Sequence, residues 1–228
     1  MLSAAVCAMA FSANADVAGD VEVIEAAQTS AFSSIYAGLG IGGSFLKCDS
    51  VDYRGLDGKE KSFTPKANRF IGSLVIGAGK VFSNNVYVGG EFMMDFTKNK
   101  KSEVEGLSER TGAHAKDEFK FGGIVPQLNL RAGYVFKNDV LAYAKLGCAW
   151  TKMSLKSFEK VGNDWKATDD GESKTKASFV LGLGAEKAFC KKFSAAIEAD
   201  YNFGWKYEGY KASKGWNVRA LVKYNVKY

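Results

Sequence analysis

The C-terminal stretch Trp216–Tyr228 alternates without a break between two kinds of side chain. One face is apolar or aromatic, with Trp216, Val218, Ala220, Val222, Tyr224, Val226 and Tyr228. The other face is mostly polar, with Asn217, Arg219, Leu221, Lys223, Asn225 and Lys227. A period of two is the pattern of a β-strand whose two faces meet different surroundings. The stretch therefore predicts either a strand of a membrane barrel or the edge strand of a soluble sandwich.

The same alternation predicts seven further strands, at residues 35–45, 70–79, 86–96, 124–134, 140–150, 178–186 and 193–203. The connections between the strands alternate in length. Tight turns are expected near Asn84, Asn138 and Lys191, and long polar loops at residues 47–66, 97–118, 157–176 and 204–215. An even number of strands with alternating long and short connections is typical of outer-membrane barrels, in which the long connections are extracellular.

Charged residues in the middle of the strands decide which face lines the barrel. A soluble lipocalin-like barrel would have an apolar lining and a polar exterior. Here the charges share the face opposite the aliphatic one, at Glu91, Arg131, Lys145, Glu198 and Lys223. The sequence therefore predicts an all-β fold, an eight-stranded antiparallel up-and-down transmembrane β-barrel with a polar lumen.

The distribution of apolar and aromatic residues agrees with a barrel in a membrane. The chain has no apolar run of the ~18 residues that a transmembrane helix requires, and only helices and closed barrels satisfy their backbone hydrogen bonds in lipid. Two girdles of aromatic side chains are expected at the two membrane interfaces. Pro126, which cannot donate to a strand ladder, is expected at a bulge near the outer rim.

The N-terminal segment resembles an export signal. Residues 1–15 are rich in apolar and small residues and end in Ala13-Asn14-Ala15, an A-x-A cleavage pattern. We expect a signal peptide at residues 1–15, a periplasmic tail at residues 16–33 and the barrel at residues 34–228.

The formal net charge of +6 is concentrated at the short turns, at Lys80, Lys137, Lys187, Lys191, Lys192 and Lys227. No basic stripe with interleaved aromatic residues is present, so a nucleic-acid partner is not expected. Cys48, Cys148 and Cys190 are predicted at three separate places on the barrel, which argues against disulfides. No His or Cys spacing suggests a metal site.

From residue 34 onward the chain resembles the small eight-stranded outer-membrane barrels, the group of OmpA-like transmembrane domains and opacity-type surface proteins. The resemblance rests on strand count, loop alternation, the leader, and the segments Gln127–Tyr134 and Tyr143–Gly147. It implies a place in the outer membrane of a Gram-negative bacterium, in contact with its lipid and lipopolysaccharide. It also implies an assembly signal read by the barrel assembly machinery, at Tyr224, Val226 and Tyr228. No peptidoglycan-binding domain follows the barrel, so anchoring to the cell wall by that route is not expected.

The inward charges are predicted to form one ion network that fills the lumen. Its members are Glu91, Asp95, Arg131, Lys145, Glu186, Glu198, Asp200, Arg219 and Lys223. A turn near Asn138 makes Arg131 and Lys145 cross-strand neighbours, and like charges in that position repel each other. We expect Glu91 and Glu198 to lie between or above them. Room for the long side chains is expected at Gly38, Gly40, Gly42, Gly182 and Gly184.

These features favour a non-enzymatic surface barrel with a structural and loop-display role, as an adhesin or antigen. Its long loops, mixed in charge, are expected to meet a host protein or glycan. A narrow porin-like channel is the first alternative, although eight strands leave a lumen that side chains can fill. An outer-membrane lipid-modifying enzyme is the second, and His114, expected in a loop, is its one candidate histidine. No catalytic residue, cofactor or metal site is predicted.

Overall fold

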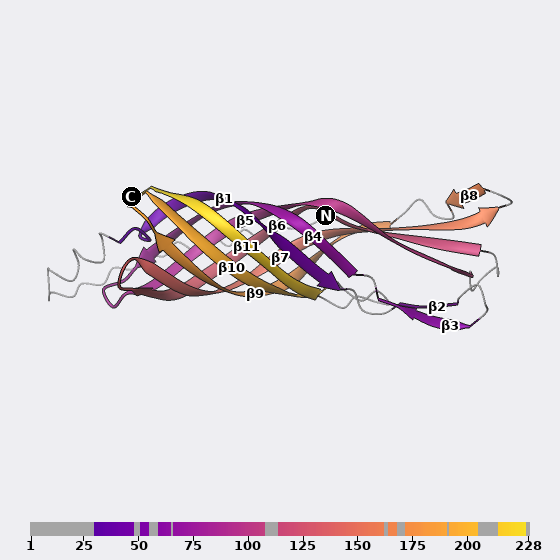
Figure 1. Cartoon of the computed structure of the whole chain (residues 1–228), viewed down its shortest axis with the longest axis horizontal. Helices are drawn as coiled ribbons and strands as arrows, with labels where there is room; N and C mark the ends of the chain where they lie inside the picture. Colours follow the sequence, from indigo (N-terminus) through magenta and orange to yellow (C-terminus); the bar gives the residue numbers. More distant parts are fainter. Residues whose placement is uncertain are drawn as a thin grey trace, which may run out of the picture.

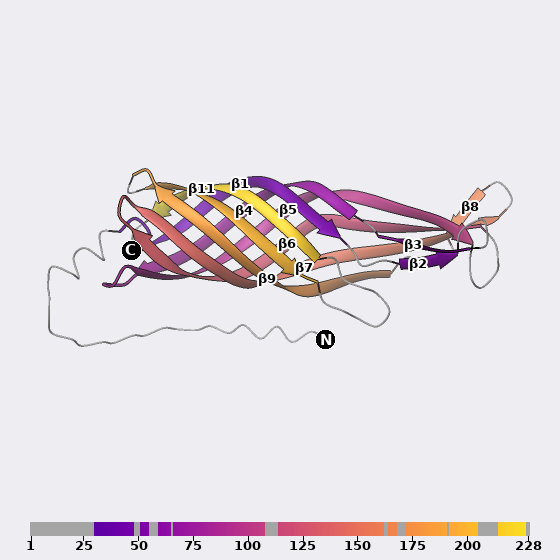
Figure 2. The same cartoon turned by 60° about the horizontal axis from the view of Figure 1, so that its bottom comes forward.

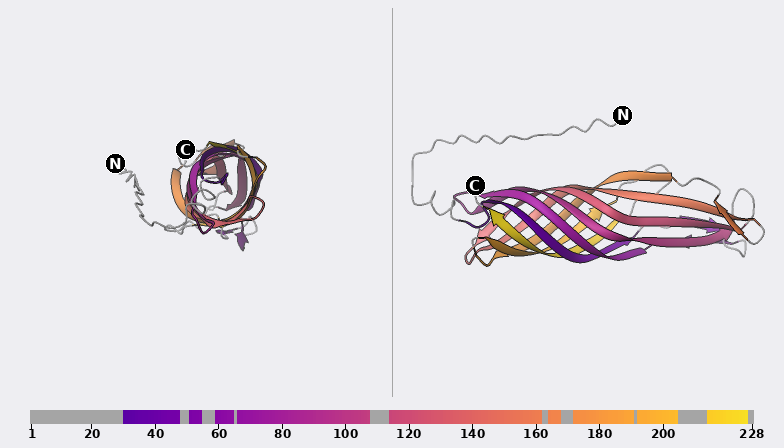
Figure 3. Two further views of the ribbon diagram at one scale, coloured as in Figure 1. Left: turned by 90° about the vertical axis from the view of Figure 1, so that its left-hand side faces the viewer. Right: turned by 90° about the horizontal axis from the view of Figure 1, so that it is seen from above.

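The computed structural model describes residues 30–47, 51–54, 59–64, 66–107, 114–161, 164–167, 172–190, 192–204 and 214–226. Eight of its strands close into a barrel, which is seen end-on in the left view of Figure 3. They are β1 (Ser34–Lys47), β4 (Lys66–Val81), β5 (Val86–Leu107), β6 (His114–Phe136), β7 (Val140–Val161), β9 (Glu172–Ala188), β10 (Phe193–Phe203) and β11 (Lys214–Val226). Among the described residues, no helix is long and apolar enough to cross a membrane.

Barrel closure depends on the pairing of the first strand with the last. β1 pairs antiparallel with β4 on one side and with β11 on the other, from Ile35 opposite Val226 to Lys47 opposite Lys214. Each remaining barrel strand pairs antiparallel with its neighbour in the ring. The predicted fold, an eight-stranded antiparallel barrel, is confirmed.

The outer face of the barrel is apolar and its inner face is polar or small. On β6, for example, Leu130 is 67% exposed and its neighbour Arg131 only 1% exposed. The inward and outward faces that were predicted for the strands are the observed ones. Exposed aromatic residues flank the aliphatic band at both ends, with Phe45, Phe96, Trp150, Phe203 and Trp216 near the long connections and Phe82, Tyr134, Phe136 and Phe193 near the short turns. From the sequence we also expect Trp205 in the girdle near the long connections and Tyr228 in the girdle near the short turns, but both residues lie outside the described part of the chain.

The short turns use residues that tolerate a left-handed backbone. Asn85 has φ 62°, Asn138 has φ 68° and Asp139 has φ 55°. Asn and Asp adopt this conformation more easily than most residues because their side chains can hydrogen-bond to the nearby backbone. The first two turns therefore form where the sequence predicted them.

The predicted extent of the long polar loops is wrong, because most of their described residues are strand. β5, β6, β7 and β9 continue far past the apolar band, and short strands β2 (Val51–Arg54), β3 (Glu60–Phe63) and β8 (Asp164–Ala167) pair beside them. Residues 98–107, 114–122, 151–161 and 172–177 thus form a projecting sheet, on the right in Figures 1 and 2. Outside the membrane neither face of a strand has to be apolar, so the period-two signal that marks the barrel strands is lost.

The projecting sheet leaves the barrel at an irregularity that includes Pro126. The pairing of β6 with β7 shifts between Phe121 and Gln127, and Gly123 has φ 93°. Because proline has no N–H, it cannot donate a hydrogen bond there. The predicted irregularity at Pro126 is therefore present on the β7 side, whereas on the β5 side Pro126 stays in register opposite Met94.

A short turn before β1 enters the mouth of the barrel at the short-turn end. Ala31 and Phe32 are 6% and 3% exposed, and they pack in an apolar cluster with Val81, Tyr87, Leu141, Tyr143 and Ala188. The Ser33 hydroxyl accepts a hydrogen bond from the Val81 backbone N–H at 3.0 Å. This turn, which the sequence did not distinguish from the tail, covers the base of the lumen.

Candidate functional site

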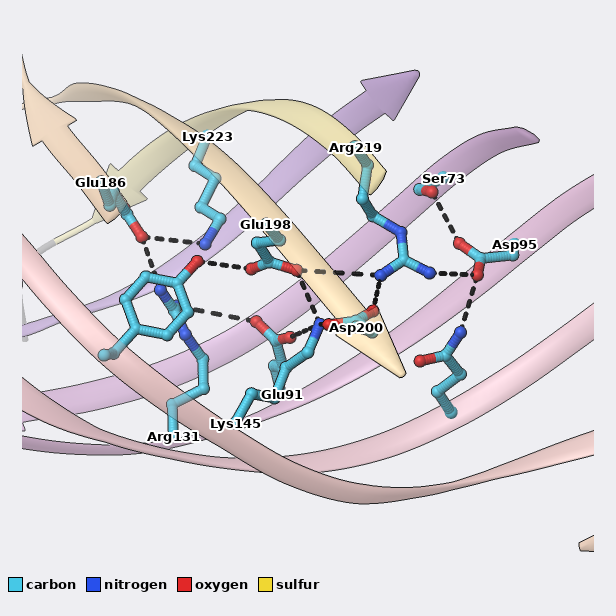
Figure 4. Close-up of polar contacts among 12 residues, drawn as sticks. Ser73, Glu91, Asp95, Arg131, Lys145, Glu186, Glu198, Asp200, Arg219 and Lys223 are labelled. Atoms are coloured by element: carbon cyan, nitrogen blue, oxygen red, sulfur yellow. Dashed lines mark hydrogen bonds and ion pairs between the residues drawn. The ribbon is translucent and has the colours of Figure 1, made fainter. Parts of the chain in front are cut away.

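Nine charged side chains lie inside the barrel and together form what we call the lumen network. They come from six strands: Glu91 and Asp95 from β5, Arg131 from β6, Lys145 from β7, Glu186 from β9, Glu198 and Asp200 from β10, and Arg219 and Lys223 from β11. Each is at most 3% exposed, since each occupies an inward position of its strand. Figure 4 shows that they point toward one another along the barrel axis.

Nearest the short turns, Glu186 binds two cations. Its Oε2 accepts hydrogen bonds from Arg131 Nη2 at 2.7 Å and from Lys223 Nζ at 2.9 Å. Its Oε1 accepts one from the hydroxyl of Ser194 at 2.6 Å. The carboxylate is therefore held from three strands, which fixes the direction of both cationic side chains.

In the middle of the lumen, two carboxylates separate Arg131 from Lys145. The two bases face each other across β6 and β7, as the turn position predicted. Glu91 lies 3.6 Å from Arg131 and 3.7 Å from Lys145, measured between the closest charged atoms. Glu198 accepts hydrogen bonds from Lys145 Nζ at 2.6 Å and from the Tyr143 hydroxyl at 2.5 Å. The repulsion between the two cations is offset by these acids.

Toward the long hairpins, Arg219 lies between two aspartates. It donates to Asp95 at 2.6 Å and also to Asp200. Asp95 accepts further hydrogen bonds from Ser73 and Gln127, both at 2.6 Å. Asp200 lies 2.9 Å from Lys145 Nζ, so this group joins the central one.

Three tyrosines surround Arg131, and the sequence analysis did not include them in the network. The guanidinium carbon lies 3.7 Å from the ring centroid of Tyr143, 5.5 Å from that of Tyr87 and 5.6 Å from that of Tyr36. The Tyr36 hydroxyl also accepts a hydrogen bond from Arg131 Nη1 and donates one to Glu91 Oε2. Cation–π contacts and hydrogen bonds thus replace the water that a buried guanidinium loses. The signal that could have identified these tyrosines in the sequence is their inward position near the predicted buried cations.

Most of the predicted glycines give space to the network. A Cβ at Gly42 would meet Arg219, one at Gly182 would meet Asp200, and one at Gly38 would meet Lys223. Gly40 instead lies against Leu221, so its space is filled by an apolar side chain. The long charged side chains therefore occupy volume that a larger residue at these glycine positions on the neighbouring strands would fill.

The acidic and basic side chains of the lumen network can neutralise one another within the barrel. The network holds the four bases Arg131, Lys145, Arg219 and Lys223 and the five acids Glu91, Asp95, Glu186, Glu198 and Asp200. The apolar cluster around Phe32 lies at its short-turn end, and buried Val125, Ala149 and Val180 pack toward its other end. Buried charges persist when they are paired and hydrogen-bonded, so this arrangement can hold a barrel rigid.

The other predicted sites fall in different places. Tyr224 and Val226 are exposed on the outer face of β11, and the Tyr224 ring packs edge-on against Phe193 at 5.2 Å between centroids. Tyr228 lies outside the described residues.

His114 is the exposed first residue of β6 rather than a loop residue, and it pairs with Leu107 of β5. Of the cysteines, Cys148 and Cys190 are free thiols, and Cys48 is outside the described residues.

Comparison with known protein families gives a match over nearly the whole chain. Residues 2–224 match the family described as outer membrane protein beta-barrel domain. The 31 kDa outer-membrane immunogenic protein of Brucella melitensis is 30% identical over 167 residues, which are 73% of this chain and 65% of that protein. The aligned part is therefore less than two thirds of this relative's length.

Solved structures with a similar fold are more distant in sequence. Neisserial surface protein A is 13% identical, with a TM-score of 0.45, and the match covers 84% of this chain and 97% of that one. The attachment invasion locus protein Ail of Yersinia pestis is 16% identical, with a TM-score of 0.43, and the match covers 85% and 99% of the two chains.

Proposed function

Because the chain belongs to the outer membrane protein beta-barrel domain family, we propose that it is a non-enzymatic surface protein that displays its projecting sheet outside the cell. It is a β-barrel of the Gram-negative outer membrane. The proposal adds two roles to this placement: mechanical support of the envelope by the barrel, and adhesion or antigenic display by the sheet.

Strand length is the observation that carries the proposal. A strand needs only about 9–11 residues to span the bilayer, whereas β5, β6 and β7 have 22, 23 and 22 residues. β10 and β11, with 11 and 13 residues, stay close to the spanning length. The excess length projects on the side of the long connections, which is the extracellular side in barrels of this kind. Binding surfaces commonly reside on segments held out by a rigid scaffold.

A narrow porin-like channel is the alternative that the lumen disfavours. The lumen network and the tyrosines around Arg131 occupy the space through which ions would pass. Eight-stranded barrels have interiors that side chains can fill. We expect purified, refolded protein to give no stable open pore in a planar bilayer, and steady conductance at neutral pH would favour the channel instead.

An outer-membrane lipid-modifying enzyme is the other alternative. A catalytic histidine requires a nucleophile or an acid held within hydrogen-bond reach. His114 is exposed on the projecting sheet, and its partner in the strand register is Leu107. We expect His114→Ala to leave lipid A composition unchanged, and loss of a lipid A modification in that variant would support an enzyme.

The proposed partners follow from this placement. The barrel contacts outer-membrane lipid, and lipopolysaccharide is the proposed lipid around its outer half. The barrel assembly machinery is proposed to read Tyr224, Val226 and Tyr228, so deleting Tyr228 should reduce the amount of heat-modifiable barrel in cells. A host protein or glycan is the proposed ligand of the projecting sheet, whose strands carry charges of both signs.

Two measurements on cells test the proposal directly. Trypsin added to intact cells should cut in the projecting sheet and spare Lys192 at the short turn between β9 and β10. A strain without the protein should lose adherence and envelope resistance. A barrel whose projecting sheet has been trimmed should restore resistance but not adherence. Cleavage only at the short turns would reverse the proposed orientation.

A further inference from the structure

The turn at residues 30–33, which we call the stopper, closes the lumen at the short-turn end. Ala31 and Phe32 are 6% and 3% exposed, although they precede the first barrel strand. They pack in one apolar cluster with side chains from β4, β5, β7 and β9, namely Val81, Tyr87, Leu141, Tyr143 and Ala188. The mouth of the barrel is therefore filled by residues that do not belong to its wall.

The stopper holds its own shape through local hydrogen bonds. The Ser33 N–H donates to the Ser30 carbonyl at 3.2 Å, and the Phe32 N–H donates to the Ser30 hydroxyl at 3.3 Å. The Ser34 hydroxyl, at the start of β1, donates to the Ala31 carbonyl at 3.0 Å. Bonds of this kind define a turn without a sheet ladder. The stopper can therefore leave the mouth as a unit, hinged at the start of β1, while the barrel pairing stays intact.

The hold of the stopper on the barrel wall combines apolar burial with side-chain hydrogen bonds. The Ser33 hydroxyl accepts a hydrogen bond from the Val81 N–H at 3.0 Å, and the Ser34 hydroxyl lies 3.5 Å from Asn225 Oδ1. A hydrogen bond that can be exchanged for one with water contributes little net stability, whereas burial of a phenylalanine side chain contributes more. Closure of the mouth therefore depends mainly on Phe32.

The rings of Tyr87 and Tyr143 separate the stopper from the lumen network. Both rings belong to the apolar cluster of the stopper, and their centroids lie 5.5 Å and 3.7 Å from the guanidinium carbon of Arg131. A Cβ at Gly79 would meet the Tyr87 ring, and one at Gly184 would meet the Tyr143 ring, so these glycines let the two rings lie against the wall. Departure of the stopper would uncover the tyrosine rings and leave Arg131 and its partners in place.

We propose that the stopper is displaceable, and that its departure opens a blind chamber in the lower lumen to water and small solutes from the periplasm. The chamber is the space that Ala31 and Phe32 fill, between the mouth and the two tyrosine rings. It is blind because the lumen network lies beyond it, followed by the buried cluster of Val125, Ala149 and Val180. That the mouth faces the periplasm rests on the proposed orientation. The N-terminal segment thus controls access to the lower lumen without forming a pore.

Phe189 offers a matched comparison at the same end of the barrel. It directly follows the last residue of β9 and is 68% exposed. Phe32 is almost completely buried at the same rim. If loss of any aromatic side chain there loosened the barrel, Phe189→Ala would have the same effect as Phe32→Ala.

The test measures how fast a charged methanethiosulfonate reagent modifies one introduced cysteine in refolded full-length protein whose native cysteines are replaced by serine. Ala188→Cys places the thiol in the stopper cluster, where Ala188 is 8% exposed. A buried thiol reacts through local opening, so its rate reports how often the stopper leaves. Burial of one phenylalanine side chain shifts an equilibrium by about 10- to 100-fold, and Phe32→Ala should speed modification by that factor. Phe32→Leu and Phe189→Ala should leave the rate close to that of the parent.

A second cysteine position tests whether the chamber is blind. Ala149, in the cluster toward the other end of the lumen, is 0% exposed. Ala149→Cys should stay unmodified in the parent and in Phe32→Ala. Modification of Ala149→Cys in the Phe32→Ala background would overturn the blind chamber.

Two further outcomes would overturn the displaceable stopper. One is an equal rate for Ala188→Cys with and without Phe32→Ala, and the other is an equal acceleration by Phe189→Ala. Heat-modifiable migration on gels shows that each variant is folded. Because the measurement uses purified protein in detergent, its failure would leave the proposed display function untouched, and loss of that function in cells would not change these rates.

Discussion

Some strands pass through both the membrane band of the barrel and the projecting sheet. The two regions differ in the pattern of their side chains but share regular antiparallel strand pairing. Within the membrane band, residues 124–134 of β6 alternate between exposed apolar and buried polar side chains, as Leu130 and Arg131 show. In the projecting sheet, residues 114–118 of β6 are His-Ala-Lys-Asp-Glu and pair with β5 and β7 as regularly as the band does. The alternation is therefore imposed by the two surroundings of the band, lipid outside and a filled lumen inside, and is not needed for strand pairing.

The two regions also place their charges differently. In the band, each charged side chain of the lumen network is buried and forms at least one ion pair with a residue of another strand. On β8, beside the projecting sheet, all four residues from Asp164 to Ala167 are exposed. A charge lost from the network removes a partner from a buried charge, whereas a charge lost from β8 leaves its neighbours in water. Substitutions in the two regions should therefore differ sharply in their effect on stability.

The largest difference is expected for a central carboxylate of the network. Glu198→Ala removes the nearest of the three carboxylates around Lys145 and the acceptor of the Tyr143 hydroxyl, and breaking a buried ion pair costs up to about 3–5 kcal/mol. The matched change Asp164→Ala, at an exposed position of β8, should cost less than about 0.5 kcal/mol. Urea unfolding of the refolded barrel in lipid vesicles measures both. Equal effects would mean that water enters the lumen and screens the network.

A charge on the lipid face should come next. Leu130 is 67% exposed on the outer side of β6, in the aliphatic band. Arginine near the middle of a bilayer destabilises a membrane barrel by about 2–4 kcal/mol, so Leu130→Arg should lower the free energy of unfolding by that amount. The control Thr175→Arg, at an exposed position of β9 in the projecting sheet, should change it by less than about 0.5 kcal/mol. A tolerated arginine at position 130 would place this part of β6 outside the membrane.

A smaller effect is expected for a single hydroxyl of the tyrosines around Arg131. Tyr143→Phe keeps the ring over the guanidinium but removes the hydrogen bond to Glu198. Hydrogen bonds to charged groups contribute about 1.5–3 kcal/mol, so the unfolding midpoint should fall accordingly. Tyr134→Phe, on the exposed outer face, serves as the control and should change the midpoint little. A neutral Tyr143→Phe would show that Lys145 alone satisfies Glu198.

The smallest effect on stability should come from removing part of the projecting sheet. Replacing residues 99–121, the outer ends of β5 and β6, by a short turn leaves the band and the lumen network intact. Loop length changes the free energy of closure only weakly, by about 0.6 kcal/mol for each doubling. The trimmed barrel should therefore refold with a nearly unchanged unfolding midpoint. A midpoint lowered as far as that of Glu198→Ala would make the sheet part of the folding core.

The amino-acid sequence by itself determined the orientation of the barrel side chains. A period of two assigns every residue of a strand to one of two faces, so Leu130 outside and Arg131 inside follow from the pattern alone. It also determined the positions of two tight turns, and hence the pairing of Arg131 with Lys145 across adjacent strands. Strand number and order follow from the same signals, because each barrel strand pairs with its neighbour along the barrel sequence until the ring closes.

Only the tertiary structure decided which groups meet across the lumen and where the strands end. Lys223 of β11 binds Glu186 of β9, two strands away, and Arg219 of β11 reaches Asp95 of β5 across the lumen as well as Asp200 of the neighbouring β10. These contacts form because the sheet curves into a closed barrel and brings their strands to one axial height. The alternation of a single strand carries no information about that height. The strand ends in the projecting sheet were hidden for a related reason. Polar and charged residues occur on both faces there, as in His-Ala-Lys-Asp-Glu at residues 114–118, so no difference in polarity marks the residues that continue to pair.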